Sequence, residues 1–232
     1  HEGLRQRQGL DINSLVLSDA ERAAATDPII QGLIELIPRA NFFDANGTPY
    51  FVGAAAARVE TNHWTVDIRQ NLGRSGRVHA FYGSQHILSR EPTASGNSIP
   101  GFGSVATLPR SLLTLSETHM FGPVVVNELR FGRNGYAGTV VPATELNPAD
   151  FGIRNGVVRP IGLPQMIVAG GLNFGGPAIL PQGRVDTLYI VNDTMTYMTS
   201  RPSLRLGGED RRFLNDKFAE GTGLFNFPSV AA

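Results

Sequence analysis

Apolar and polar residues alternate along much of the chain from residue 61 onward. Trp64, Val66 and Ile68, for example, alternate with Asp67 and Arg69. A strand with one apolar and one polar face produces this period of two. Similar segments follow, and we expect neighbouring ones to pair as antiparallel hairpins. The predicted strands cover about 61–72, 77–90, 110–121, 124–134, 184–199 and 203–214, and residues 222–227 are a candidate seventh.

The alternation also predicts which side chains share a face of the sheet. The apolar face should carry Trp64, Val66, Ile68, Leu129, Phe131, Leu204 and Leu206. The opposite face should carry Asp67, Arg69, Glu128, Arg130, Arg205, Glu209 and Arg211. On that face Glu128 with Arg130, and Glu209 with Arg211, place opposite charges two residues apart. This spacing favours a charged wall over a catalytic pair of carboxylates.

The first sixty residues show no such alternation, and we expect a loop region with short helices over 1–60. Ser18 and Glu21 have the spacing of a capping box, and Asp27-Pro28 is typical of a helix start. Helix should be confined mainly to 18–37. Residues 61–232 should then hold the β-barrel strands and long extracellular loops, and the whole chain should be a single incomplete domain.

The connections between predicted strands alternate in length. Those at 73–76, 122–123 and 200–202 are short, whereas about 90–109 and 135–183 are long. Short turns at one end and long loops at the other are typical of an up-and-down transmembrane β-barrel. Four aromatic residues are candidates for its interfacial girdles: Trp64, Tyr82, Tyr189 and Tyr197. A soluble β-sandwich would show the same alternation and stays open as the alternative.

Composition narrows the functional classes. The formal net charge is 0 and the pI is about 7.2, which argues against a nucleic-acid partner. Cysteine is absent, so disulfides, thiolate metal sites and cysteine nucleophiles are excluded. No apolar run is long enough for a transmembrane helix, and no signal peptide opens the chain. Because the sequence starts at His1 rather than Met, we expect a piece of a longer protein.

No motif in the sequence predicts catalysis. Residues 101–106 fit G-x-G-x-x-A, but a dinucleotide site needs a strand before and a helix after this motif, and the sequence predicts neither. The glycines at 170–171 and 175–176 lack the Lys-Ser/Thr of a phosphate-binding loop. The five histidines form no helical metal-ligand pair, and Ser75 and Ser84 lie in no nucleophile elbow. We therefore predict no enzyme activity, no catalytic or metal-binding residue and no cofactor, with the ligand-binding residues unknown.

Four segments resemble the Oar-like TonB-dependent receptors of the bacterial outer membrane. They are 2–6 (EGLRQ), 61–85 (TNHWTVDIRQNLGRSGRVHAFYGSQ), 112–133 (LLTLSETHMFGPVVVNELRFGR) and 203–213 (SLRLGGEDRRF). They follow the family order and cover about a quarter of the chain. The energy-coupling box, the plug domain and the closing strand of that family are not visible in this sequence.

The resemblance implies an all-β, antiparallel segment of a larger transmembrane barrel, since such receptors have twenty-two strands. It implies partners as well: outer-membrane lipid, the remaining barrel and plug of the same protein, and the TonB complex acting through that plug. The implied function is energy-coupled uptake of a bulky nutrient such as a siderophore or a glycan. The alternative is a secreted or surface β-sandwich module that binds carbohydrate or protein.

Overall fold

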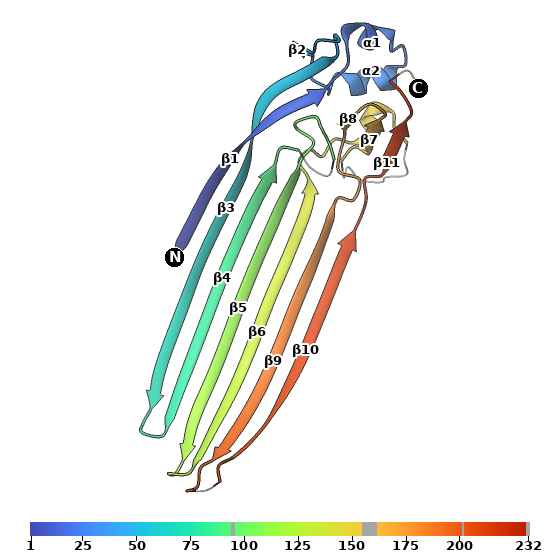
Figure 1. Ribbon diagram of the computed structural model, residues 1–232. Helices are drawn as coiled ribbons and strands as arrows, with labels where there is room; N and C mark the ends of the chain where they lie inside the picture. The colour runs from blue at the N-terminus through green and yellow to red at the C-terminus, as the bar shows by residue number, and fades with distance from the viewer. Residues whose placement is uncertain (94–95, 155–161, 201, 231–232) are drawn as a thin grey trace.

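The computed structural model describes residues 1–93, 96–154, 162–200 and 202–230, and its main element is one large antiparallel sheet. Seven long strands follow the order β1-β3-β4-β5-β6-β9-β10, and the short β2 pairs with β3. Their bounds are β1 Glu2–Leu15, β2 Phe42–Phe43, β3 Pro49–Leu72, β4 Gly76–Glu91, β5 Ser104–Phe121, β6 Val125–Pro142, β9 Gln182–Tyr197 and β10 Leu204–Ala219. Figure 1 shows these strands running from a folded cap at the upper end to short turns at the lower end.

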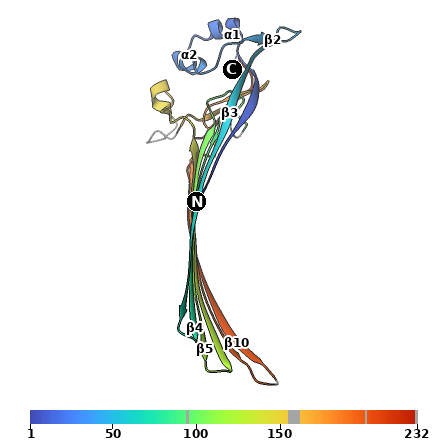
Figure 2. The same ribbon diagram turned by 90° about the vertical axis from the view of Figure 1, so that its left-hand side faces the viewer.

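All six strands predicted from the alternation are present, and they pair in the predicted order. Five of them are longer than predicted, chiefly at the cap end; β5, for instance, begins at Ser104 rather than near residue 110. The sixth, β9, has the predicted length but begins and ends two residues earlier, at Gln182–Tyr197. The pairing has no bulge, because every register runs without a shift from one end to the other. Figure 2 shows the sheet edge-on as a single bowed layer.

The expectation of a loop region over 1–60 is corrected in part. Residues Glu2–Leu15 form β1, which pairs antiparallel with the first half of β3. β3 begins at Pro49, so it runs through the expected boundary at residue 60. Neither segment alternates clearly, because the half of β3 nearest the cap is rich in alanine and mixes polar with apolar residues on both faces. Backbone pairing between distant segments forms these strands.

The two helices lie where the capping signals predicted them. α1 spans Asp19–Ala24, and its Ser18 and Glu21 form the complete capping box. α2 spans Pro28–Ile34; the Asp27 side chain accepts hydrogen bonds from the backbone of Ile29 and Ile30. Arg22 of α1 donates to the carbonyl oxygens of Ile34, Ile37 and Pro38, which ties the end of α2 to α1.

The long connection predicted over 135–183 contains structure of its own. β6 extends into it as far as Pro142, a 3-10 turn covers Pro148–Phe151, and β7 (Gln165–Val168) and β8 (Leu172–Phe174) form a hairpin. The candidate seventh strand is β11 (Leu224–Phe227), but it pairs parallel with β7 in this small sheet rather than with the large one. Arg201, in the turn predicted at 200–202, lies outside the described residues.

The large sheet is open. Among the described residues, β1 pairs with β3 alone and β10 pairs with β9 alone. The sheet therefore has two free long edges, one at β1 and one at β10. Each free edge presents backbone donors and acceptors without partners. The chain therefore forms a curved wall and not a closed barrel.

The hairpin between β2 and β3 predicts a response to acid. Asp44 accepts hydrogen bonds from the backbone N–H groups of Thr48 (2.8 Å) and Asn46 (2.9 Å), and the bond from Thr48 is the main cause of its lowered pKa. A carboxyl with a lowered folded pKa stabilises the turn above its unfolded pKa of about 3.9, and this stabilisation is lost as the pH falls through the lowered value. The protection factor of the Thr48 amide, which is the exchange rate corrected for its intrinsic dependence on pH, should therefore fall below about pH 4. Asp44→Asn should remove this pH dependence, and an unchanged pH profile in that variant would contradict the assignment.

Candidate functional site

The register of the large sheet sorts its side chains into two faces, because residues directly opposite each other on paired strands share a face. One row on the first face reads Ile68, Ala80, Leu115, Phe131 and Val191. One row on the second face reads Arg69, His79, Ser116, Arg130, Asn192 and Glu209. Every residue predicted for each face lies on it, so the predicted faces are confirmed.

The first face, called here the apolar face, is most uniform on β3, β4 and the adjoining part of β5. Trp64 and Tyr82 contact each other on it, with ring centroids 5.1 Å apart. Phe131 and Tyr189 form a second aromatic contact at 6.4 Å. From β5 toward β10 the face is interrupted by charged residues that the register places on the same side: Glu117, Arg133, Asp193, Asp210 and Arg212.

The second face, called here the polar face, is charged near the short turns. Glu128 pairs with Arg130, and Glu209 pairs with Arg211, as predicted. Asp67 lies 3.2 Å from Arg69 and 3.1 Å from His79, which belongs to the next strand. These pairs are exposed, so each contributes at most about 1 kcal/mol to stability. Their main effect is to make this face favourable only against water or a polar surface.

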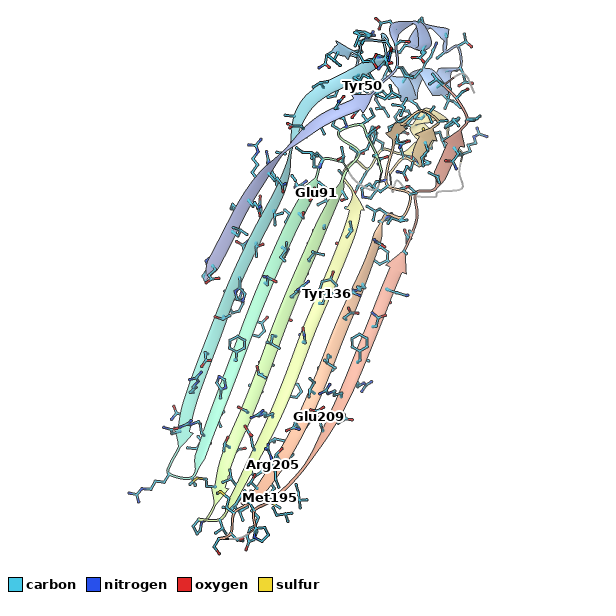
Figure 3. The ribbon with its side chains drawn as sticks, in the orientation of Figure 1. Tyr50, Glu91, Tyr136, Met195, Arg205 and Glu209 are labelled. Carbon is cyan, nitrogen blue, oxygen red and sulfur yellow. The ribbon has the colours of Figure 1, made fainter. Side chains whose placement is uncertain are left out.

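A second polar row crosses the polar face nearer the cap. It contains His63, Gln85, Arg110, Tyr136, Asp186 and Asn215, one residue from each of six adjacent strands. We call it the upper polar row. Figure 3 shows Tyr136 between Glu209, near the turns, and Glu91, at the cap end.

Tyr136 is the centre of the upper polar row. The guanidinium carbons of Arg110 and Arg184 lie 5.5 and 5.1 Å from its ring centroid, within cation–π range. Arg184 is also 3.2 Å from Asp186, which accepts a hydrogen bond from Asn215. The aromatic ring and its flanking groups thus form one connected cluster across β5, β6, β9 and β10.

A shallow hollow of about 270 Å³ lies beside this cluster, over β3 to β6. His63, Gln85, Arg110 and Asn134 line it with imidazole, amide and guanidinium groups. Such groups can donate hydrogen bonds to oxygen atoms of a ligand. The sequence did not single out these residues, because their alignment depends on six strands coming into register.

The cap lies on the polar face. Ser14 of β1 and Phe51 of β3 are directly opposite each other on that face; Ser14 hydrogen-bonds to the carbonyl of Ser98, and Phe51 packs on the cap core. The core joins the α1–α2 segment, the loop after β4 and the small sheet. Its buried members include Val16, Leu33, Ile34, Ile37, Ile99, Phe102, Leu163, Met166, Leu172 and Phe174.

An open pocket of about 470 Å³ separates α2 from the small sheet. Leu33, Ile37, Met166 and Phe174 give it an apolar floor, and Glu21 lies among its lining residues. The volume is within the range of small-ligand sites. The pocket is therefore the candidate site in this cap for an apolar group of a ligand.

Asn97 holds the loop after β4 against the small sheet. Its buried amide donates to the carbonyl oxygens of Phe102 (3.0 Å) and Gly175 (2.8 Å), and accepts from Gln165 (3.2 Å). Asn97→Ala should destabilise the cap by about 1–3 kcal/mol, because it leaves buried carbonyl groups without a donor. Hydrogen exchange of the β7–β8 hairpin should report this change. Exposed Asn226 offers a matched Asn→Ala control, and equal exchange in the two variants would contradict this role.

A family model described as an outer membrane beta barrel domain matches residues 2–232. The chain belongs to this family of outer membrane barrels. No curated protein and no solved structure matches the chain.

Membership of the outer membrane barrels places the protein in the outer membrane of a Gram-negative-type bacterium. In such barrels the short turns are periplasmic and the long loops extracellular, so we expect the cap on the extracellular side. Among the described residues, no helix is both long and apolar enough to cross a membrane. The soluble β-sandwich alternative is wrong, because the described strands form no second large sheet facing the first.

The apolar face of this outer membrane barrel has dimensions that suit lipid. From Leu72 to Trp64, eight residues along β3 span about 26 Å, or about 20 Å along the membrane normal at the usual strand tilt of about 40°. The apolar band of such barrels is about 25 Å tall. Trp64, Tyr82 and Tyr189 lie near its cap end and Tyr197 near its turn end, all on the apolar face, as the girdle prediction requires.

The remaining motifs of the outer membrane barrel lie in strands and loops. Within residues 101–106 a strand, β5, begins at Ser104 and no helix follows. His79 and His86 lie on opposite faces of β4, as expected. In the described ranges, no three histidine or acidic side chains come together in a way that could hold a metal ion. Gly170–Gly171 and Gly175–Gly176 belong to the small sheet of the cap and its connections.

Proposed function

We propose that this chain is part of the wall of a TonB-dependent receptor that takes up a bulky nutrient, such as a siderophore or a glycan, by energy-coupled transport. The observation that carries the proposal is the open sheet with a polar inner face. Free strand edges are not tolerated in lipid, where each unsatisfied backbone group costs several kcal/mol. Further strands must therefore continue the sheet at β1 and at β10.

The width of the completed barrel supports a transporter rather than a small, filled barrel. Barrel diameter grows with strand number, and about eight strands leave an interior that side chains fill. Seven strands here form only a bowed layer (Figure 2). A polar face that is charged over its whole width suits a wide lumen containing water and a plug.

The segments that resemble the receptors lie on paired strands. Residues 61–85 cover the turn of the β3–β4 hairpin, and 112–133 cover the turn of the β5–β6 hairpin. All of 203–213 except its first residue lies on β10. In the proposed receptor the upper polar row contacts the nutrient from the barrel wall, and the cap pocket contacts it from the extracellular side. The TonB complex acts on the plug.

We further propose that this segment has no catalytic role. In the upper polar row, His63 lies on β3 and Asp186 lies on β9, and three strands separate β3 from β9. This separation supports a binding wall rather than an acid–base pair. In the proposed mechanism the nutrient crosses the membrane unchanged.

Uptake by cells tests the transport proposal. A strain lacking the full-length protein and a complemented strain should be compared for accumulation of radiolabelled ferric siderophores and fluorescent oligosaccharides. Accumulation of a probe should depend on the protein and should stop when an uncoupler collapses the proton-motive force. Equal uptake with and without the uncoupler would instead indicate a passive pore.

Reconstitution tests the proposal that the wall is incomplete. Residues 1–232 alone should neither insert stably into liposomes nor transport anything, because both sheet edges would meet lipid. Heat-resistant migration in gels and protease protection would measure insertion, with the full-length protein as the control. Stable insertion of residues 1–232 as a small closed barrel would contradict the proposal that these strands are part of a larger barrel.

A further inference from the structure

The shallow hollow over β3 to β6 presents polar side chains that the chain itself does not use. Four such side chains line it: His63, Gln85, Arg110 and Asn134. None of them forms a hydrogen bond or an ion pair with another residue that the structure describes. Nearer the short turns of the same face, by contrast, Glu128 pairs with Arg130. The donors of the hollow are therefore available to a ligand.

Arg110 carries a positive charge that no neighbour balances. Across the sheet it lies directly opposite Gln85 and Tyr136. Along β5 its neighbours on the same face are Leu108 and Leu112. None of these side chains is acidic, and Arg110 itself is exposed. Its guanidinium group can therefore take an anion from the lumen.

Tyr136 holds this guanidinium group beside the hollow. The guanidinium carbons of Arg110 and Arg184 lie 5.5 and 5.1 Å from the centroid of its ring, which is cation–π range. The two arginines differ in one respect. Arg184 has a carboxylate 3.2 Å away, that of Asp186, whereas Arg110 has none among the described residues. The carboxylate that Arg110 lacks is the group that we expect a ligand to supply.

The shape of the hollow favours an extended ligand over a compact anion. Its four donors lie on four adjacent strands, and the three spacings between these strands amount to about 14 Å. A compact anion contacts one end of such a span, whereas a short oligosaccharide carries hydroxyl groups along all of it. Phe81 and Leu112 add apolar surface to the lining, against which the C–H groups of a sugar ring can pack.

We propose that this hollow binds an acidic oligosaccharide, with a sugar carboxylate on Arg110 and the hydroxyl groups of adjoining sugar units on the other three donors. A guanidinium group binds a carboxylate through two parallel charge-assisted hydrogen bonds. One carboxylate also matches the single unpaired charge, whereas a phosphate group carries about 1.5 to 2 negative charges. This inference rests on the proposed function, because it names the class of nutrient that the wall contacts.

The first test compares ligands on the unaltered full-length protein in mild detergent. Calorimetric titration would use short oligosaccharides of glucuronate, galacturonate and mannuronate, and the same compounds with their carboxyl groups reduced to alcohols. At least one acidic compound should bind at least tenfold more tightly than its reduced form, because it alone pairs with the guanidinium group. If every acidic compound binds no better than its reduced form, the proposal is wrong.

The second test assigns the preference to Arg110. Arg110→Gln should weaken binding of the acidic compound at least tenfold and leave binding of the reduced compound unchanged. Arg205→Gln is the matched control, because Arg205 is also exposed on the polar face and lies near the turns, far from Tyr136 (Figure 3). An equal loss in the two variants would indicate a general attraction of anions to the lumen and would overturn the site.

Asn134→Ala gives an independent measurement if Arg110→Gln folds poorly. Because the Asn134 amide is assigned to a hydroxyl group, this variant should weaken the acidic and the reduced compound alike, by about two- to tenfold. Unchanged binding of both compounds would show that the hollow is not the site.

Two further outcomes separate this inference from its alternatives. Citrate at the same carboxylate concentration should not displace the oligosaccharide, and displacement would assign Arg110 to compact anions and overturn the proposal. The titrations need no energy source, so binding that depends on Arg110 without energy-coupled uptake would contradict transport alone. Energy-coupled uptake of a ferric siderophore, with no acidic oligosaccharide bound, would overturn this inference and leave transport standing.

Discussion

Leu115→Arg should weaken the folding of the full-length barrel into lipid vesicles by about 2–4 kcal/mol, the cost of an arginine at the lipid face near the bilayer midplane. Leu115 is 40% exposed on the apolar face. It lies between Ala80 and Phe131 on the neighbouring strands, well inside the band between the aromatic girdles. Urea titration of folding in vesicles, followed by the heat-modifiable shift in gels, would measure the change.

The adjacent residue provides the control. Thr114 lies on the polar face, between Phe81 and Gly132, so Thr114→Arg places the same side chain on the same strand toward the lumen. Its folding free energy should change by less than about 1 kcal/mol. An equal loss in the two variants would mean that the faces have been assigned to lipid and lumen wrongly.

Gly175→Ala should disrupt the cap by about 3–5 kcal/mol, the combined cost of backbone strain and overpacking. Gly175 has φ of +93°, a conformation that favours glycine, and a Cβ atom there would lie 2.1 Å from the carbonyl oxygen of Pro164. That oxygen belongs to the backbone and has no alternative rotamer. Hydrogen exchange should therefore show loss of protection in β7, β8 and β11, while the strands of the large sheet stay protected.

The variant Gly170→Ala distinguishes the cost of backbone strain from the cost of a steric clash. Its φ is +107°, but a Cβ atom there would meet nothing within 4 Å. Gly170→Ala should then cost only the backbone strain, about 1–3 kcal/mol. If Gly175→Ala proves no worse than Gly170→Ala, the close packing of the loop after β8 against Pro164 is not what holds the cap.

Local patterns in the sequence predicted the parts of the fold that depend on near neighbours. Within the membrane band, lipid on one side and water on the other impose an alternation that residues such as Val66 and Asp67 display. The short turns at 73–75 and 122–124 leave adjacent strands no partner except each other. The helix starts at Ser18 and Asp27 were predictable because capping is a contact between residues two or three positions apart.

The resemblance to the receptors predicted the outer membrane family, and the match to residues 2–232 confirms an outer membrane barrel. Energy-coupled transport, the plug and the TonB complex remain predictions, because the family match extends only to an outer membrane barrel domain. The absence of enzyme activity also remains a prediction.

What the sequence determined by itself was the period-two pattern of the membrane band, the order of its hairpins and the two capped helices. The tertiary structure alone decided the strand β1, the half of β3 nearest the cap, the parallel pairing of β11 with β7 and the packing of the cap on the polar face. It also aligned the upper polar row and set Arg110 between Gln85 and Tyr136. The physical reason is that these features depend on backbone pairing and packing between residues far apart in the chain. Outside the membrane band water reaches both faces of a strand, so the sequence there need not alternate and does not predict these features.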